Sequence, residues 1–242
     1  MQKKGNKYGT HRVIEPKGVL TQAAYRIDNN MAEIYSNEIL VDVTALNIDS
    51  ASFTQISEAC GGDEKKIGEM ILSIVAERGK QQNPVTGSGG MFIGIVNTIG
   101  DDLKDEIDLK PGDKIASLVS LSLTPLRIDK ILAVHKDIDR VDIVGQAILF
   151  ESGLYARLPD DLSEKLSLAA LDVAGAPAQT AKLVQVNNDV LVLGAAGKSG
   201  MLVCTEAMKR VGPLGHVVAV VLTQEDADLL KSMKLCTHAI VA

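Results

Sequence analysis

The stretch VLVLGAAGKSG, residues 190–200, decides the fold of the second half of the chain. Four apolar residues lead into a run that contains Gly194, Gly197 and Gly200. A Lys-Ser pair follows Gly197, which is also how a nucleoside-triphosphate P-loop ends. The two interpretations predict different proteins, and the spacing of the glycines separates them.

A P-loop has the spacing G-x-x-x-x-G-K-[ST], which requires a glycine where this chain has Val192. A dinucleotide-binding turn requires a buried strand, a glycine-rich turn and a helix whose first amides meet a pyrophosphate. VLVLGAAGKSGMLVCTEAMKR supplies these three parts in that order. We therefore predict a pyrophosphate turn, with a plain helix-packing turn as the alternative.

The cofactor contacts follow from this prediction. We expect them from Gly194, Ala196, Gly197, Lys198, Ser199, Gly200 and Thr223. An acidic residue at the end of the second strand would select NAD, but that place reads VLT. Glu225 and Asp226 come slightly later and are predicted to open the next helix. No arginine near this place would bind the 2′-phosphate of NADP either, so the sequence does not distinguish NAD from NADP as the cofactor.

The pattern around this turn predicts an α/β domain over residues 158–242. Residues 162–185 are helical in character, a helix ends at Gly212, and apolar strands alternate with helices. Continuously apolar strands predict a parallel sheet that is covered on both faces. The chain stops inside the third strand, from which we expect a truncated Rossmann domain, its first half only.

Residues 1–157 are expected to form a β-rich domain. Residues 38–48 alternate with the period of a half-buried strand, and residues 63–79 carry a helical pattern that Gly79 ends. Turns such as PVTGSGG and LKPGD separate further short strands. The stretch near 51–83 is interpreted as a helical insertion.

Composition and charge exclude several classes of protein. The formal net charge is −6 without a basic block, which argues against a nucleic-acid partner. Cys60, Cys204 and Cys236 are widely spaced, as expected of free thiols in a reducing cytosol. The N-terminus lacks the apolar core of a signal peptide, and no apolar run approaches the roughly 20 residues of a membrane span. We expect a cytoplasmic protein.

The two halves together resemble the medium-chain dehydrogenase/reductase family. GSGGMFIGIVNTIG…LKPGDKIASL is similar to its GHExxGxVxxxG…VKPGDrV segment, and LVLGAAGKSG to its GAAGGVG loop. The resemblance implies a GroES-like first domain, a nicotinamide cofactor and a homodimer. Blocks such as KYGTHRVIEPKGVL and ALDVAGAPAQT are unlike those of ordinary alcohol dehydrogenases in that family.

This chain departs from the zinc-binding members of that family. Where they have a cysteine after the VxVxAxxI strand, this chain has Asp49. The His and Glu of GHE fall on Gly90 and Met91, and the third ligand position falls near Asp172. Without this ligand set we expect no zinc.

By the same resemblance, Asp49 and Asp172 would face the place where hydride leaves the substrate. Two carboxylates suit a cationic amine, and we expect them to be catalytic, in proton transfer and amine binding. The alternatives are a turn-capping role for Asp49 and a surface position for Asp172.

A substrate carboxylate needs a cation, for which Arg12, Lys17 and Arg26 are candidates. His11 is expected to assist them or to be hydrogen-bonded structure. The implied enzyme is an NAD(P)-dependent amino-acid dehydrogenase that deaminates a diamino acid. A zinc-free quinone or enone reductase of the same fold and an inactive cofactor-binding fragment are the alternatives.

Overall fold

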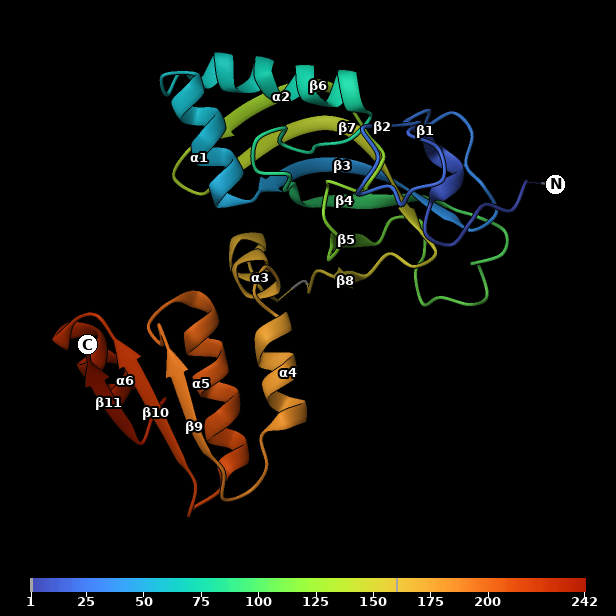
Figure 1. Ribbon diagram of the computed structural model, residues 1–242. Helices are drawn as coiled ribbons and strands as arrows, with labels where there is room; N and C mark the ends of the chain where they lie inside the picture. Colours follow the sequence, from blue (N-terminus) through green and yellow to red (C-terminus); the bar gives the residue numbers. More distant parts are fainter. Residues whose placement is uncertain (1, 160) are drawn as a thin grey trace. The chain divides into compact units, whose positions relative to one another are not determined.

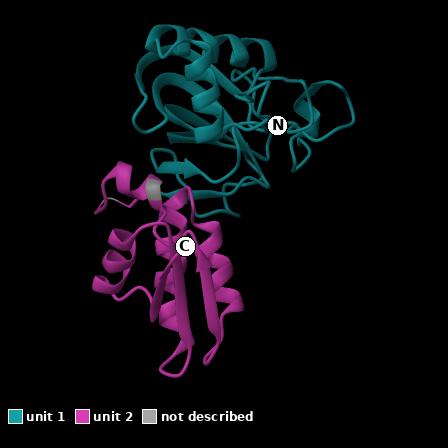
Figure 2. Cartoon of the chain, turned by 60° about the vertical axis from the view of Figure 1, so that its left-hand side comes forward, with its two compact units in different colours: residues 1–158 teal, residues 159–242 magenta. Residues whose placement is uncertain are grey.

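The computed structural model describes residues 2–159 and 161–242. Contacts divide the chain into two compact units, Met1–Leu158 and Pro159–Ala242 (Figure 2). The division lies one residue from the boundary expected between residues 157 and 158. A β-rich first unit followed by an α/β unit with a parallel sheet is the fold class that the sequence predicted.

The first unit consists mainly of antiparallel strands. Its elements are η1 (Thr10–Arg12), β1 (Val13–Glu15), β2 (Arg26–Ile27), β3 (Glu38–Ile48), α1 (Ser50–Ala59), α2 (Glu64–Arg78), β4 (Gly90–Ile99), β5 (Lys114–Ser117), β6 (Leu126–His135), β7 (Arg140–Phe150) and β8 (Tyr155–Arg157). Six strands form one sheet in the order β6-β7-β3-β4-β5-β8, and β1 pairs with β2 in a small hairpin.

Strand β3 has the bounds predicted from its alternating sequence, but it is not half-buried. Leu40, which the alternation placed on the outer face, is buried beside Ile148 and Phe150 in a second apolar cluster. Val41 and Val43 belong to the main core and Leu40 to this second cluster, so both faces of the strand are largely covered. Thr44 is the one exposed residue of this strand.

Two helices occupy the stretch that was interpreted as an insertion, and they pack along one side of the sheet (Figure 1). Helix α2 confirms the predicted helix: the Asp63 side chain accepts from the Lys66 amide, and Gly79 ends the helix with a φ of 73°. The sequence analysis missed helix α1. Its sequence SASFTQISEA has few apolar residues, of which Phe53 and Ile56 face the core.

The second unit alternates helices and strands. Its elements are α3 (Glu164–Leu171), α4 (Gly175–Leu183), β9 (Asp189–Leu193), α5 (Lys198–Val211), β10 (His216–Val221), α6 (Gln224–Ser232) and β11 (His238–Val241). The three strands are parallel, in the order β11-β10-β9. Helix α5 ends at Gly212 as predicted, and the helical stretch 162–185 contains α3 and α4.

The expectation of a sheet covered on both faces was wrong for the described residues of this unit. Helices α5 and α6 cover the face that carries Val192 and Ala219, whereas α3 and α4 pack against α5. On the other face, the side chains of Leu191 and Leu193 are 61% and 74% exposed. Among the described residues, no helix combines the length and apolar composition that crossing a membrane requires.

Candidate functional site

The glycine-rich turn joins β9 to α5 with the geometry of a phosphate-binding loop. Gly194 has a φ of 70°, a left-handed conformation that glycine adopts without steric cost. Gly197 is the N-cap of α5 and offers no side chain to satisfy the first amides of the helix. The amides of Lys198, Ser199 and Gly200 have no partner within the helix, and they carry the positive end of its dipole.

Two glycines of the turn have different steric roles. A Cβ atom on Gly200 would lie 2.4 Å from the Gly194 carbonyl oxygen and 2.7 Å from the Ala195 Cα atom. Only glycine allows α5 to approach the strand end this closely. A Cβ atom on Gly197 would meet one atom, at 3.5 Å, so this position is open. Open backbone beside unpaired amides fits a pyrophosphate group.

Lys198 and Asp172 form an ion pair at this turn. The Lys198 Nζ atom lies 3.2 Å from the Asp172 Oδ2 atom, and Asp172 is the C-cap residue of α3. The sequence predicted separate roles for these residues, a phosphate contact for Lys198 and a catalytic carboxylate for Asp172. The fold of the second unit brings them to one place, the N-terminus of α5.

Thr223 has a structural role in addition to its expected cofactor contact, which stays a prediction. Its hydroxyl accepts from the Asp226 amide at 3.1 Å and donates to the Asp226 carboxylate at 2.8 Å. Thr223 is therefore the N-cap of α6, and its side chain stabilises the start of that helix. Glu225 and Asp226 lie in the first turn of α6, which confirms that they open this helix. Ala196 is half-buried in the glycine turn.

Asp49 lies at the junction of β3 and α1. It occupies the N-cap position of α1, but its side chain makes no capping hydrogen bond. Instead its Oδ2 atom accepts from the Gly89 amide at 3.1 Å, just before β4 begins. Its half-buried side chain is therefore oriented by the loop before β4 and not by its own helix.

Arg12 is not a substrate-binding residue in this structure, which corrects the prediction. It is 1% exposed, and its Nε and Nη2 atoms donate to the two oxygens of Glu38 at 2.6 and 2.7 Å. The remaining donors reach Asp28 and the carbonyls of Asn30 and Glu33. All five guanidinium donors are thus used inside the first unit.

His11 belongs to the same buried cluster. Its Nε2 atom lies 2.8 Å from Glu38, and its Nδ1 atom accepts from the Asn6 amide. This confirms the alternative of hydrogen-bonded structure. Burial alone would raise the pKa of Glu38, but the hydrogen bonds and charge of Arg12, with His11 and the Tyr35 amide, lower it to about 2.

The two other expected cations lie at the surface. Lys17 is in the turn of the β1–β2 hairpin, Arg26 is in β2, and both are exposed. Neither makes an ion pair with any residue that the structure describes. Their charges are therefore available to an anionic group, and their role in holding the substrate carboxylate stays a prediction.

A run of buried polar residues that was not predicted from the sequence follows α2. Lys80 is fully buried, and its Nζ atom donates to the carbonyls of Thr21 and Gln22 at 2.6 and 3.3 Å. Burial, with the nearby charge of Arg78, lowers the pKa of Lys80 to about 8. Gln81 is also fully buried, and its amide group has no hydrogen-bond partner. The one available signal was the composition of KQQN, directly after a helix-ending glycine.

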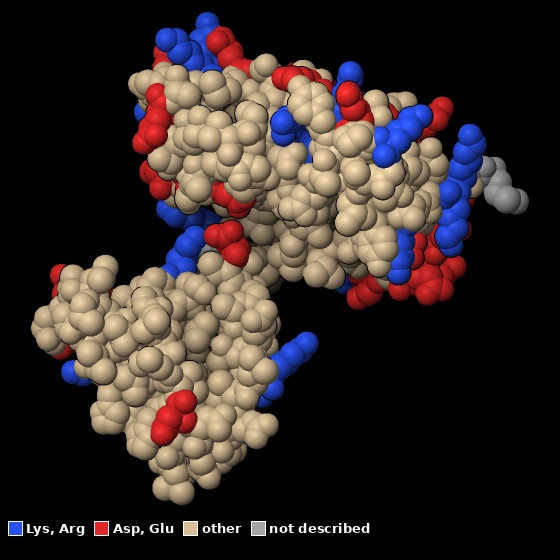
Figure 3. All heavy atoms as spheres, in the orientation of Figure 1, with Lys and Arg blue, Asp and Glu red and all other residues tan. Residues whose placement is uncertain are grey.

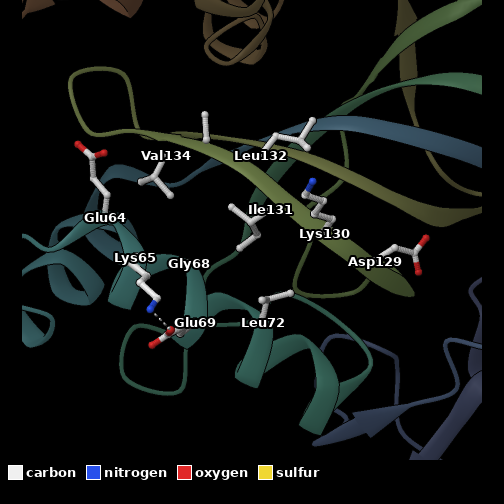
Figure 4. Close-up of a pocket in the computed structure, with 11 residues that line it drawn as sticks. Glu64, Lys65, Gly68, Glu69, Leu72, Asp129, Lys130, Ile131, Leu132 and Val134 are labelled. Atoms are coloured by element: carbon white, nitrogen blue, oxygen red, sulfur yellow. Dashed lines mark ion pairs between the residues drawn. The ribbon is translucent and has the colours of Figure 1, made fainter.

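The first unit also has a groove of about 500 Å³ between α2 and β6 (Figure 4). Leu72, Ile131 and Val134 contribute apolar side chains, and Lys65 and Glu69 form an ion pair on its rim. None of the predicted site residues lines it. We therefore do not place the reaction there.

The described residues offer neither a metal-binding cluster nor a reactive thiol at the expected positions. Among residues 2–159 and 161–242, no group of three or more His, Cys, Asp or Glu side chains is placed to hold a metal ion. The cysteines are free and buried, as predicted for free thiols. Burial, with the nearby Cys236, raises the pKa of Cys204 to about 11, and this thiol is therefore unreactive at neutral pH. On the faces visible in Figure 3, basic residues are interspersed with acidic ones.

A parallel strand, a glycine turn and a helix with open first amides, in one chain with an antiparallel β unit, define a dinucleotide-dependent oxidoreductase. The sequence model of the L-erythro-3,5-diaminohexanoate dehydrogenase N-terminal domain matches residues 11–159. The chain belongs to the L-erythro-3,5-diaminohexanoate dehydrogenase family.

Two relatives with that name support the assignment. The protein of Acetoanaerobium sticklandii is 65% identical over 239 residues, which are 99% of this chain and 69% of the relative. The protein of Fusobacterium nucleatum is 64% identical over 240 residues, again 99% of this chain and 69% of the relative. The long blocks KYGTHRVIEPKGVLTQAAYRIDN and GQAILFESGLYARLPDDLS also resemble this family.

Solved structures are more distantly similar. A mycobacterial quinone oxidoreductase is 17% identical with a TM-score of 0.49, over 85% of this chain and 50% of that one. The CurK enoyl reductase is 16% identical, also with a TM-score of 0.49, over 85% of this chain and 51% of that one. At this level of similarity no activity is transferred.

Proposed function

We propose that the protein catalyses the NAD(P)-dependent oxidative deamination of L-erythro-3,5-diaminohexanoate to 5-amino-3-oxohexanoate and ammonia, a step of lysine fermentation. The observation that carries the proposal is the 65% identity, over 99% of this chain, to a relative named for that substrate. The glycine turn before α5 supports the cofactor requirement independently.

The chain has a suitable place for the cofactor. The first amides of α5 and the ammonium of Lys198 would hold the pyrophosphate, and Gly200 lets the helix come close to the strand end. The nicotinamide, when bound, accepts the hydride from the substrate carbon. Neither an acidic ribose partner nor a 2′-phosphate partner distinguishes NAD from NADP.

The reaction consumes the substrate ammonium, one oxidised nicotinamide and one water. It yields the ketone, an ammonium ion, the reduced nicotinamide and one proton. Asp49 would take a proton from the substrate ammonium, because one of its oxygens is held by Gly89 and the other has no described partner. After releasing that proton to solvent, the carboxylate would take a proton from the water that adds to the iminium carbon and pass it to the leaving nitrogen, so that ammonia departs. Asp172 is proposed for amine binding and proton transfer at the turn that Lys198 shares.

Further parts of the proposal rest on the sequence. Lys17 and Arg26 would bind the substrate carboxylate. No zinc would take part, because the positions of the zinc ligands in zinc-binding medium-chain dehydrogenases correspond here to Asp49, Gly90 and Asp172. A homodimer and a cytoplasmic location are also retained as predictions.

The test is the absorbance of reduced nicotinamide, measured with L-erythro-3,5-diaminohexanoate and either NAD or NADP. We expect a signal that depends on the diamine and falls at least about 100-fold in Asp49→Asn. Asp137→Asn is the matched control, since Asp137 is exposed in the turn between β6 and β7. A folded protein without a diamine-dependent signal would contradict the proposal. A signal that depends on a quinone would favour the reductase alternative.

A further inference from the structure

The segment before β4 is fastened to the start of α1 by a set of polar contacts, and it carries the amide that binds Asp49. We call residues 83–89 the 83–89 loop. The Ser52 hydroxyl, one turn into α1, lies 2.5 Å from both the Thr86 and the Ser88 hydroxyls. Ser52 is fully buried, whereas Thr86 is exposed and Ser88 is half-buried.

Asn83 closes the other end of this loop. Its side-chain amide donates to the Ser52 carbonyl at 3.2 Å and to the Gln55 side chain at 2.8 Å. Its side-chain oxygen accepts from the Val85 and Thr86 amides. The loop is therefore stiffened internally and attached to α1 at both of its ends.

Gly89 connects this attachment to Asp49. A Cβ atom on Gly89 would lie 2.5 Å from the Ser122 amide nitrogen and 2.7 Å from the Gln81 carbonyl oxygen. Both are backbone atoms that cannot move aside, and glycine is therefore the residue that fits. Its N–H points at the Asp49 carboxylate from a position fixed on one side by this packing and on the other by Ser88.

We infer that the 83–89 loop is a positioning element, which through the Ser52–Thr86–Ser88 hydroxyls and the Gly89 amide fixes the orientation of the Asp49 carboxylate. Asp49 and Ser52 are separated by one helical turn, and Gly89 and Ser88 are adjacent. The two contacts therefore form neighbouring attachments between the same two segments. One carboxylate oxygen is held, and the other is kept in a constant direction for the substrate.

This inference rests on the proposed catalytic role of Asp49, and its value for catalysis comes from orientation. A misplacement of about 1 Å can cost on the order of 100-fold in rate, although the affected residue never touches the substrate. Ser52, Thr86 and Ser88 are therefore positioning residues, which do not touch the substrate. Their hydroxyls affect the reaction only through the orientation of the Asp49 carboxylate.

The experiment compares variants that remove a hydroxyl with variants that retain one. Ser52→Ala and Thr86→Val remove it, Thr86→Ser retains it, and Ser57→Ala is the control from the same helix. The Ser57 hydroxyl makes no hydrogen bond with a described residue. Thr86 is exposed, and its replacement does not threaten folding.

The first readout is the amide proton of Gly89 in the NMR spectrum of the folded protein. We expect Ser52→Ala and Thr86→Val to move this resonance upfield and to speed its exchange with solvent about tenfold, because the bond to Asp49 loosens. Thr86→Ser and Ser57→Ala should keep the wild-type resonance. An unchanged Gly89 resonance in Ser52→Ala overturns the inference, whatever the activity.

The second readout is kinetic. We expect Ser52→Ala to lower kcat about tenfold while KM for the nicotinamide cofactor stays within about twofold, and Thr86→Ser to restore what Thr86→Val loses. If Ser52→Ala lowers kcat and raises the KM for the cofactor by similar factors, the positioning role is overturned. If the Gly89 resonance responds but Asp49→Asn keeps the wild-type kcat, the inference about orientation stands and the proposed role of Asp49 fails.

Discussion

Lys198 and Asp172 are 26 residues apart in the chain, and their side chains lie 3.2 Å apart at the first turn of α5. The pair is partly exposed, at 61% and 37% of the two side chains, and an ion pair of this kind contributes at most about 1 kcal/mol to stability. The pair matters because of its location, since the Lys198 ammonium is the one proposed to contact a phosphate of the cofactor.

Removing the two charges should therefore affect cofactor binding in opposite directions. Lys198→Met should raise the Kd of the nicotinamide cofactor about tenfold, because a phosphate loses a cation. Asp172→Asn should lower the Kd about twofold, because Lys198 no longer has a competing anion. Titration calorimetry measures both, with Lys182→Met from the exposed part of α4 as the control. A weaker cofactor affinity in both variants would contradict this account.

Gly200 should not tolerate a methyl group. The added Cβ atom would lie 2.4 Å from the Gly194 carbonyl, so α5 must shift away from the strand end. We expect Gly200→Ala to destabilise the second unit by about 1–3 kcal/mol in urea unfolding and to abolish cofactor binding. Gly175→Ala is the matched control. Gly175 opens α4 with no atom within 4 Å of an added Cβ, and this change should stabilise by up to about 1 kcal/mol. Equal stability of the two variants would refute the close-approach argument.

Glu38 should give the first unit a pH-dependent stability on the acid side. Its pKa is about 2 in the folded protein, below the ordinary value of 4.5. The unfolded chain therefore binds more protons between these values, and stability is lost as the pH falls from about 4.5 to 2. The difference corresponds to about 3 kcal/mol.

Urea unfolding followed from pH 7 to pH 2.5 checks this prediction. Glu38→Gln should remove most of the acid dependence and should also leave the buried Arg12 without its counter-charge, at a cost of about 3–5 kcal/mol at pH 7. Glu33→Gln is the control, since the Glu33 side chain is exposed and Arg12 contacts only its carbonyl. An acid dependence that persists in Glu38→Gln would assign the effect to other carboxylates.

Lys80 should also make stability rise with pH, but in the alkaline range. Its pKa is about 8 in the folded protein, below the ordinary value of 10.5, because its charged form is buried. Protonated Lys80 therefore costs stability below pH 8, and this cost disappears as the pH rises toward 10.5. We expect a contribution of about 3 kcal/mol that grows over this range.

Lys80→Met tests the point by unfolding at pH 7.5 and pH 10. The variant should lose the rise in stability between these values, although two carbonyls lose their donor. Lys65→Met changes an exposed lysine on α2 and should keep the rise. A rise that is the same in both variants would show that Lys80 is not its source.

The sequence predicted those elements that depend on neighbouring residues. The alternation of residues 38–48 predicted β3, the helical spacing before Gly79 predicted α2, and the three-glycine run predicted the turn into α5. Each of these patterns is local, because a strand or helix repeats every few residues and glycine is needed where φ becomes positive. The family assignment likewise followed from continuous blocks of sequence.

Side-chain partners were decided by the tertiary structure. The sequence alone is consistent with Arg12 as a substrate-binding cation. In the structure, its guanidinium pairs with the Glu38 carboxylate at the start of β3. Thr223 was expected to contact the cofactor, and the tertiary structure shows that its hydroxyl also caps α6. Lys80 gave no sign of burial, because burial depends on the packing of segments far apart in the chain.

The sequence by itself therefore determined where β3, α2 and the glycine turn into α5 lie, since these follow from periodicity and backbone conformation, whereas α1, with few apolar residues, was missed. The tertiary structure alone decided which charges meet. Asp172 reaches Lys198, and Gly89 reaches Asp49 across 40 residues of chain. Such contacts depend on how packed elements fix distances between segments, and no local pattern records that distance.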